Sequence, residues 1–347
     1  MLHIDGSKHS GSGTVLRYAA ALATLKKEPL HIFNIRAKRD KPGLRPQHVM
    51  ALRACAALSS GILEGDEINS KEVFYRPGQK IQGGKFEWDI GTAGSSTMLA
   101  FTLISPALYA ERRCSFLITG GLFQDFAPTA FHMREILLPM LRKMGIEIEI
   151  EIIRPGYVPK GQGALRMAVQ PIRTPLKPIG LLDQGKVLEI RGISLASHLK
   201  KEKVSERMAK QCQEILEREG YEPRLEIQHD TSAVQRGAAL IVWAITSGGC
   251  ILGADQAGKR GRRSEAIAES VCKSLLEDLK TKATTDRHLA DQLILFAALA
   301  KGKSEYSIPA VTEHVQSNLW LANEILGADS DLQDNRISID GVGFYNL

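Results

Sequence analysis

The chain has 347 residues, of which 44% are hydrophobic and 24% charged, with 45 Lys and Arg against 39 Asp and Glu. This composition excludes a disordered chain, a collagen and a disulfide-rich mini-scaffold, and the length suits roughly two domains. No run reaches the ~18 apolar residues that a membrane span needs, and residues 1–10 lack the apolar core of a signal peptide, so we expect a cytoplasmic protein without membrane contact.

The first predicted elements form an α/β unit. A strand-like segment at 2–4 leads into a turn rich in Gly and Ser that ends at Gly13. Apolar residues at helical spacing predict a helix over 14–25, and an apolar run predicts a strand over 30–35. A second helix is expected over 46–59, followed by a Gly and an apolar–acidic segment that predicts another strand.

The same order of elements returns further along the chain, as a strand, a glycine turn, a helix, a strand and a helix. These elements are expected at 86–90, 91–96, 97–109, 114–119 and 128–144. Asp5 and Asp89 hold equivalent positions in the two stretches, about 84 residues apart. That offset is typical of a repeated α/β unit.

A third run of similar order lies near the end of the chain. It comprises helices over 288–300 and 312–326 and strands over 306–309 and 336–339. An uninterrupted third copy would begin its first helix near residue 181, so the spacing indicates an insertion of roughly 100 residues. The inserted block has its own predicted strands and helices, at 187–195, 201–219, 224–228, 238–246 and 264–280.

We therefore predict an α/β fold in which a repeated core is interrupted by a small α/β domain. The core comprises residues 1–182 and 283–347, and the inserted domain comprises 183–282. An N-terminal domain followed by a separate C-terminal domain is the alternative architecture.

Common nucleotide-binding fingerprints are missing from the sequence, which contains neither a G-x-x-x-x-G-K-[ST] loop nor a G-x-G-x-x-G turn. Two Gly-rich turns open helices instead, and the N-terminus of a helix attracts anions. Arg17 follows one turn into the first helix, and Arg36 and Arg39 follow the strand expected beside it. The pattern predicts a phosphate site, although structural turns and a solvated basic face are the alternative.

His314 is the most suggestive of the nine histidines because it is expected in the first turn of an amphipathic helix. A neutral imidazole is a nitrogen nucleophile near pH 7. A capping or surface histidine is the alternative. The five cysteines are isolated and never spaced as C-x-x-C, which argues against both a disulfide framework and a zinc site.

Several runs together resemble the RNA 3'-terminal phosphate cyclase family, in their order and in their separation along the chain. They are Asn34 to His48, Gly91 to Ser95, Gly120-Gly121 with Ala127-Pro128, Leu289 to Leu293, and Glu313-His314. The resemblance implies three units, each a four-stranded sheet with two helices, and a small inserted domain with a topology similar to thioredoxin.

The resemblance also implies a ligase that uses ATP and a divalent metal, Mg or Mn, to convert an RNA 3'-terminal phosphate into a 2',3'-cyclic phosphate. His314 would attack the α-phosphorus of ATP and form a covalent His-AMP adduct. AMP would pass to the RNA 3'-phosphate, and the neighbouring 2'-hydroxyl would close the ring and expel AMP. Activation is needed because a phosphate monoester oxygen is a poor leaving group, and the vicinal hydroxyl has a proximity advantage over water.

Positions that match functional residues of the family imply three groups of site residues in this chain. The catalytic residue is His314, the nucleotide is bound by Asp291, His288, Gln292 and Pro128, and the RNA phosphate is surrounded by Arg17, Arg36, Arg39, Gln47 and His48. His288 stands where the family commonly has a Tyr that stacks on the base.

The sequence departs from the family in the first glycine turn and around the second. Ser10 replaces an acidic residue expected to help hold the metal, and Thr14 replaces a Gln, so the metal ligands are left unassigned. Phe123 and Phe131 also replace residues that are polar in the family. A non-catalytic RNA-binding scaffold, similar to the cyclase-like ribosome-biogenesis factors, and an adenylyltransferase for another polynucleotide phosphate end are the alternative functions.

Overall fold

A computed structural model of the chain describes residues 1–125 and 127–345. The first unit contains a four-stranded sheet and two helices. Its elements are β1 (Leu2–Asp5), α1 (Gly13–Lys26), β2 (Leu30–Phe33), α2 (Pro46–Ser59), β3 (Ile62–Glu64) and β4 (Val73–Arg76).

The second unit repeats this order, with its second helix divided by a π-helical turn. Its elements are β5 (Gly84–Asp89), α3 (Ser96–Leu108), β6 (Cys114–Gly120), α4 (Ala130–His132), η1 (Met133–Leu137), α5 (Leu138–Lys143), β7 (Ile148–Arg154) and β8 (Gly163–Val169). The helix expected over 128–144 is therefore present but shorter at its start, because Thr129 caps it by accepting a hydrogen bond from the His132 N–H.

The third unit begins with a strand of two residues and resumes about a hundred residues later. Its elements are β9 (Gly180–Leu181), α8 (Leu289–Leu299), β14 (Lys301–Ser307), α9 (Glu313–Leu321), η2 (Ala322–Leu326), β15 (Asp329–Gln333) and β16 (Arg336–Val342). The strand expected over 306–309 was placed wrongly, since β14 starts directly after α8. Pairing with β16 along its whole length carries the strand through the polar start at Lys301, and β9 pairs with it only at Glu305 and Tyr306.

All three sheets share one topology. The first two strands of each unit are parallel, and the last two join them antiparallel, giving the orders β1-β2-β4-β3, β5-β6-β8-β7 and β9-β14-β16-β15. A parallel pair needs a crossover helix, which α1, α3 and α8 provide. The α/β class and the repeated four-stranded units are thus confirmed.

A fourth sheet lies between β9 and α8 in the chain, so it interrupts the third unit after its first strand. Its elements are β10 (Val187–Ser197), α6 (Val204–Arg218), β11 (Pro223–Asp230), β12 (Gly237–Thr246), β13 (Ile251–Ala257) and α7 (Ser264–Lys280), with the strand order β11-β10-β12-β13. We propose this block as the inserted domain. The expected boundaries, 183–282, fall in the connections that flank it.

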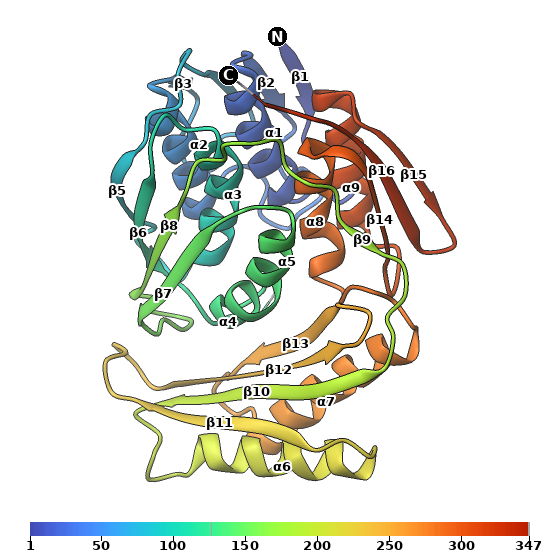
Figure 1. The fold of residues 1–347 in the computed structure, drawn as a ribbon. Helices are drawn as coiled ribbons and strands as arrows, with labels where there is room; N and C mark the ends of the chain where they lie inside the picture. Colours follow the sequence, from blue (N-terminus) through green and yellow to red (C-terminus); the bar gives the residue numbers. More distant parts are fainter. Residues whose placement is uncertain (126, 346–347) are drawn as a thin grey trace.

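The helices of the three units lie at the centre of the core and the sheets lie around them (Figure 1). Helix α1 is buried from Gly13 to Leu25, and α3 and α8 are buried at nearly every position. Helices without a polar face are stable only when neighbours surround them. Among the described residues, no helix is long and apolar enough to cross a membrane.

Candidate active site

One cavity of about 560 Å³ is lined by every residue that the sequence predicted for the site. These residues come from all three units of the core and lie as far apart in the chain as Arg17 and His314. The predicted residues are Arg17, Arg36, Arg39, Gln47, His48, Pro128, His288, Asp291, Gln292 and His314.

The N-terminal ends of helices α1, α2, α3, α8 and α9 converge on this cavity. Each contributes a residue of its first turn or its N-cap, and these are Thr14, Gln47, Ser95, Asp291 and His314 in that order. Helix N-termini carry free N–H groups and a partial positive charge. The cavity therefore favours phosphate groups even before its arginines are counted.

Gly13 permits two basic side chains to approach the start of α1. A Cβ at this position would lie 2.2 Å from His48 Nε2 and 2.9 Å from Arg17 Nη1. The turn itself is closed by Ser12, whose hydroxyl accepts a hydrogen bond from the Thr14 N–H. A glycine is needed here because of close packing.

Arg17 is the most buried cation of the site, with 9% of its surface exposed. Its Nη2 donates to Thr14 Oγ1 at 3.3 Å. Burial, together with the charge of Arg36, lowers the pKa of Arg17 to about 10, so it remains positive at neutral pH. Within residues 1–125 and 127–345, Arg17 forms no ion pair with a carboxylate, so this buried cation is suited to an anionic ligand.

The loop that carries Arg36 and Arg39 is folded back on itself. Arg36 Nη1 donates to the carbonyl oxygens of Lys41 and Gly43, at 2.7 and 2.8 Å. Burial and the neighbouring arginines lower the pKa of Arg36. Arg39 is exposed at the rim of the cavity, where it can meet a ligand that enters from solvent.

His48 and Gln47 complete this end of the cavity. His48 Nδ1 accepts a hydrogen bond from the Arg45 N–H at 3.1 Å, which leaves the proton of the neutral ring on Nε2, beside Arg17. Burial and the arginines Arg17, Arg36 and Arg45 hold the pKa of His48 well below its usual value. Gln47 Oε1 accepts from the Ser95 N–H at 2.7 Å and so links the first unit to the second.

His314 lies in the first turn of α9, and its Nδ1 is 3.2 Å from Thr14 Oγ1. In the tautomer with the proton on Nδ1, His314 donates to Thr14 Oγ1, which also accepts from Arg17 Nη2. That tautomer leaves the lone pair on Nε2. Burial, with Arg17 and Arg39 nearby, lowers the pKa of His314, which keeps the ring neutral at pH 7.

The other end of the cavity is formed by Asp291, Gln292, His288 and Pro128. The backbone oxygen of Asp291 accepts from the Tyr18 hydroxyl at 3.1 Å, and burial, helped by Asp286, raises the pKa of its carboxyl to about 7. Gln292 is buried, and its Oε1 has no hydrogen-bond partner among the described residues. An orphaned acceptor on the wall of a cavity suits a ligand that carries N–H or O–H groups.

A buried His–Asp pair supports this end from behind. His132 Nε2 lies 3.2 Å from both carboxylate oxygens of Asp286, and both side chains are fully buried. Asp286 also accepts from the N–H groups of His288, Leu289 and Gly253. Burial disfavours the charged form of each side chain, but their mutual attraction outweighs it. The pKa of His132 is therefore raised, and that of Asp286 is lowered to about 2.

The donor set does not fit a metal held by protein ligands alone. Among the described residues, no group of three or more His, Cys, Asp or Glu side chains converges on one point. Ser10 is buried and accepts a hydrogen bond from the Ser317 hydroxyl at 2.8 Å, so it joins the turn before α1 to α9 by a neutral contact.

Sequence reasoning missed several residues of the cavity wall. The missed residues are Tyr18, Met98, Phe101, Gln124, Asp125 and Ala127. Gly13, Thr14 and Ser95 also line the cavity, and they belong to the two glycine turns where the sequence predicted a phosphate site. Gln124 and Asp125 had no such signal, because they belong to a loop whose path depends on packing between units.

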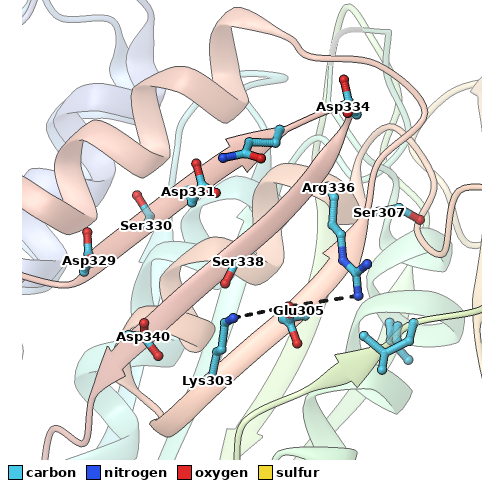
Figure 2. Close-up of a pocket in the computed structure, with 13 residues that line it drawn as sticks. Lys303, Glu305, Ser307, Asp329, Ser330, Asp331, Asp334, Arg336, Ser338 and Asp340 are labelled. Carbon is cyan, nitrogen blue, oxygen red and sulfur yellow. Dashed lines mark ion pairs between the residues drawn. The ribbon is translucent and has the colours of Figure 1, made fainter.

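A second hollow, of about 680 Å³, lies on the open face of the sheet that contains β14, β15 and β16. Figure 2 shows its polar side chains spread along the strands. Glu305 pairs with both Lys303, at 3.4 Å, and Arg336, at 4.0 Å. Its five carboxylates, Glu305, Asp329, Asp331, Asp334 and Asp340, outnumber its two cations, and no predicted site residue lines it, so we regard this hollow as a solvated acidic sheet face that does not suit a phosphate group.

Comparison with known proteins gives one consistent family. A family model described as RNA 3'-terminal phosphate cyclase matches residues 8–332. A protein of that name from Archaeoglobus fulgidus is 36% identical over 345 residues, which cover 98% of this chain and 100% of the relative. Those from Pyrobaculum aerophilum and Pyrococcus furiosus are 33% and 37% identical and cover 99% and 94% of both chains.

Proposed function

Because this chain belongs to the RNA 3'-terminal phosphate cyclase family, we propose that it uses ATP to convert the 3'-terminal phosphate of an RNA into a 2',3'-cyclic phosphate. The observation that carries the proposal is the position of His314. Its neutral ring shares one cavity with three arginines and with helix N-termini from every unit of the core.

The proposed reaction has three steps, and in each step one bond to phosphorus forms and another breaks. His314 Nε2 attacks the α-phosphorus of ATP, and the bond from that phosphorus to the pyrophosphate oxygen breaks. An oxygen of the RNA 3'-phosphate attacks the same phosphorus, which frees the imidazole and gives an RNA-adenylate. The RNA 2'-hydroxyl attacks the RNA phosphorus, AMP departs, and the hydroxyl proton goes to solvent.

The two ends of the cavity would hold the two substrates. We assign the RNA phosphate to the end with Arg17, Arg36, Arg39, Gln47 and His48, where every side chain can donate a hydrogen bond. We assign the nucleoside of ATP to the end with Pro128, His288, Asp291 and Gln292. The free Oε1 of Gln292 is an acceptor for an amino group of the base.

A divalent metal, Mg or Mn, would reach the site with the triphosphate of the nucleotide, whose oxygens it prefers as ligands. We place no protein ligand on it, since the carboxylate of Asp125 is already paired with Arg262 and that of Asp291 is largely buried. The steps above use residues of this chain alone.

The direct test is to incubate the protein with MgATP and an RNA that ends in a 3'-phosphate. We expect the RNA end to become resistant to a phosphomonoesterase and one AMP to be released for each end modified. AMP that remains on the RNA, or that appears on a 5'-phosphate, would instead favour the adenylyltransferase alternative. The presence of His314 in the cavity disfavours a non-catalytic scaffold.

Arg39→Ala should weaken binding of 3'-phosphorylated RNA by about 10-fold or more, because a hydrogen bond between a cation and a phosphate is lost. Binding of RNA with a 3'-hydroxyl should change much less. The measurement is a titration of both RNAs by fluorescence anisotropy. Lys41→Ala is the matched control, since Lys41 is exposed in the same loop but does not line the cavity. Equal losses of affinity for the two RNAs would mean that Arg39 only attracts the RNA backbone and does not recognise the 3'-phosphate.

Thr14→Val should slow adenylylation of the protein roughly 3- to 10-fold, because the hydroxyl that orients His314 is replaced by a methyl group. The KM for ATP should change little, and Thr14→Ser should restore the rate. The rate should be measured from pH 5 to 8. In the original protein the lowered pKa of His314 should keep the rate high below pH 6.5, until protonation removes the lone pair. Equal effects of Val and Ser would exclude the hydroxyl from this role.

A further inference from the structure

The largest cavity near the active site, about 1080 Å³, lies between the second unit and the inserted block. One wall is the connection between β7 and β8, residues 157–160. The other wall comes from the β11–β12 connection at 235–238 and from residues 257–262, which precede α7. We call this cavity the interdomain cleft.

Hydrogen bonds between the two walls fix the position of one wall relative to the other, so they define the shape of the interdomain cleft. The Tyr157 and Ser197 hydroxyls are 2.8 Å apart. Gln235 Nε2 donates to the carbonyl oxygen of Val158 at 2.8 Å, and its Oε1 accepts from the Lys160 N–H at 3.0 Å. Gly237 is also required, because a Cβ there would lie 2.2 Å from the Tyr157 ring.

The interdomain cleft has a strong excess of positive charge. Five cations line it, Lys160, Arg236, Lys259, Arg260 and Arg262, against one carboxylate, that of Asp125. Arg262 Nη1 and Nη2 donate to the two carboxylate oxygens of Asp125, each at 2.9 Å. Arg236 pairs with Glu202 at 3.3 Å. Within the described residues, Lys160, Lys259 and Arg260 have no acidic partner within 4 Å, which leaves three cations for a polyanion.

Most of the remaining lining is apolar. Val158 is 58% exposed although it belongs to this wall, and Pro159, Leu199 and Ile267 are among its neighbours. Apolar surfaces against which bases can pack, beside cations that follow a phosphate backbone, are typical of sites for single-stranded nucleic acid. An acidic peptide would use the cations but would leave the apolar surface without a matched partner.

The interdomain cleft adjoins the active-site cavity. Gln124 and Asp125 line both. The Gln124 side chain reaches the Ser95 N–H once its amide is oriented to satisfy its neighbours, and that same N–H donates to Gln47. A chain that leaves the phosphate site past Gln124 therefore enters the interdomain cleft directly.

We propose that the interdomain cleft binds the nucleotides upstream of the RNA 3' end, as single-stranded RNA, and that the inserted block thereby contributes to substrate binding. This inference rests on the proposed function, which places the RNA 3'-phosphate beside Gln47. It assigns a role to Lys160, Lys259 and Arg260, none of which lines the active-site cavity. The competing exit for the RNA is over the basic loop 36–45, which carries Arg36 and Arg39.

The test compares 3'-phosphorylated oligoribonucleotides of 2, 4, 8 and 12 residues on the full chain. In the original protein, affinity should rise with length until the interdomain cleft is filled. Changing Lys160, Lys259 and Arg260 together to Ala should reduce the affinity for the 12-mer by about 10-fold more than the affinity for the dinucleotide. The number of counterions released on binding of the 12-mer should fall by about 2. The matched control changes Lys210, Arg218 and Lys273, three exposed cations on α6 and α7, to Ala and should keep the length dependence.

Crosslinking identifies the path of the RNA directly. A 12-mer with 4-thiouridine three residues from its 3'-phosphate should crosslink to residues 157–160 or 257–262. Crosslinks to 36–45, or a triple variant with the length dependence of the original protein, would overturn the interdomain cleft as the RNA path. Failure of the proposed function is a separate result, since it would give equal affinity for 3'-phosphate and 3'-hydroxyl ends in the original protein.

Discussion

His314→Ala should abolish transfer of AMP to the protein and reduce cyclisation by about 10⁴-fold or more, the loss expected when a covalent nucleophile is removed. The side chain has no evident substitute. Among the described residues, the other histidines of the cavity are His48, whose Nδ1 accepts from the backbone and whose Nε2 faces Arg17, and His288, at the nucleoside end. The measurement uses ATP labelled at the α-phosphate and asks whether label stays on the denatured chain.

Two variants make the His314 result interpretable. His3→Ala, at an exposed site on β1, should retain full labelling and controls for the loss of a histidine. A chemically prepared RNA-adenylate should still be cyclised by His314→Ala, because ring closure does not use the imidazole. Label that persists in His314→Ala would contradict the proposed nucleophile and point to another residue of the cavity.

Five expected helices lie within one residue of α1, α2, α3, α7 and α8 at each end, and in α1 and α2 local signals define these ends. The helix expected over 46–59 matches α2, and that over 264–280 matches α7. Pro46 opens α2 at a position where a missing N–H costs nothing, and Ser60 closes it in the left-handed region. Helix α1 differs by one residue at each end, since Ser12 caps it.

Two short strands, β9 and β4, could not be predicted because pairing alone defines them. Gly180–Leu181 is two residues long and becomes a strand only beside β14. β4 alternates buried Val73 and Tyr75 with exposed residues, a pattern too short to stand out from a loop. The sequence therefore revealed the repeat through its helices, while the identical strand order of the three sheets required the structure.

The candidate site divides in the same way. Cations and His314 were marked by residue type and by the family resemblance, whereas the contact between Thr14 and His314 joins residues 300 positions apart. The departures at Phe123 and Phe131 also have a structural reason. Their rings pack 4.8 Å apart, with Tyr157 beside Phe123, so an aromatic cluster supports the wall of the interdomain cleft.

Repetition explains why one site uses every unit of the core. Each unit is too small to bury its helices alone, and packing α1, α3 and α8 together brings the same end of each to the centre. The positive ends of these helices would repel one another without an anion between them. A phosphate bound at the proposed site would therefore relieve a charge arrangement that the fold itself creates.

Asp286→Ala should destabilise the protein by about 3–5 kcal/mol, the cost of breaking one side of a buried ion pair. The change leaves His132 without its partner and also orphans the N–H groups of His288, Leu289 and Gly253. Those donors belong to the start of α8 and to β13. Loss of Asp286 should therefore destabilise both the nucleoside end of the cavity and the contact between α8 and the inserted block. Chemical denaturation at pH 5.5 measures the effect, and Asp66→Asn, which removes an exposed partner of Arg53, should cost no more than about 1 kcal/mol.

The pH dependence of this difference follows from the sign of each shift. The pKa of Asp286 is lowered from 3.8 to about 2, so its contribution is present above pH 4 and is lost as the pH falls toward 2. The pKa of His132 is raised above 6.5, so its contribution is complete below pH 6.5 and is lost as the pH rises through the raised value. The stability gap between the original protein and Asp286→Ala should thus be widest between about pH 4 and 6.5. A gap that stays constant from pH 2 to 9 would mean that the pair acts through its hydrogen bonds and not through its charges.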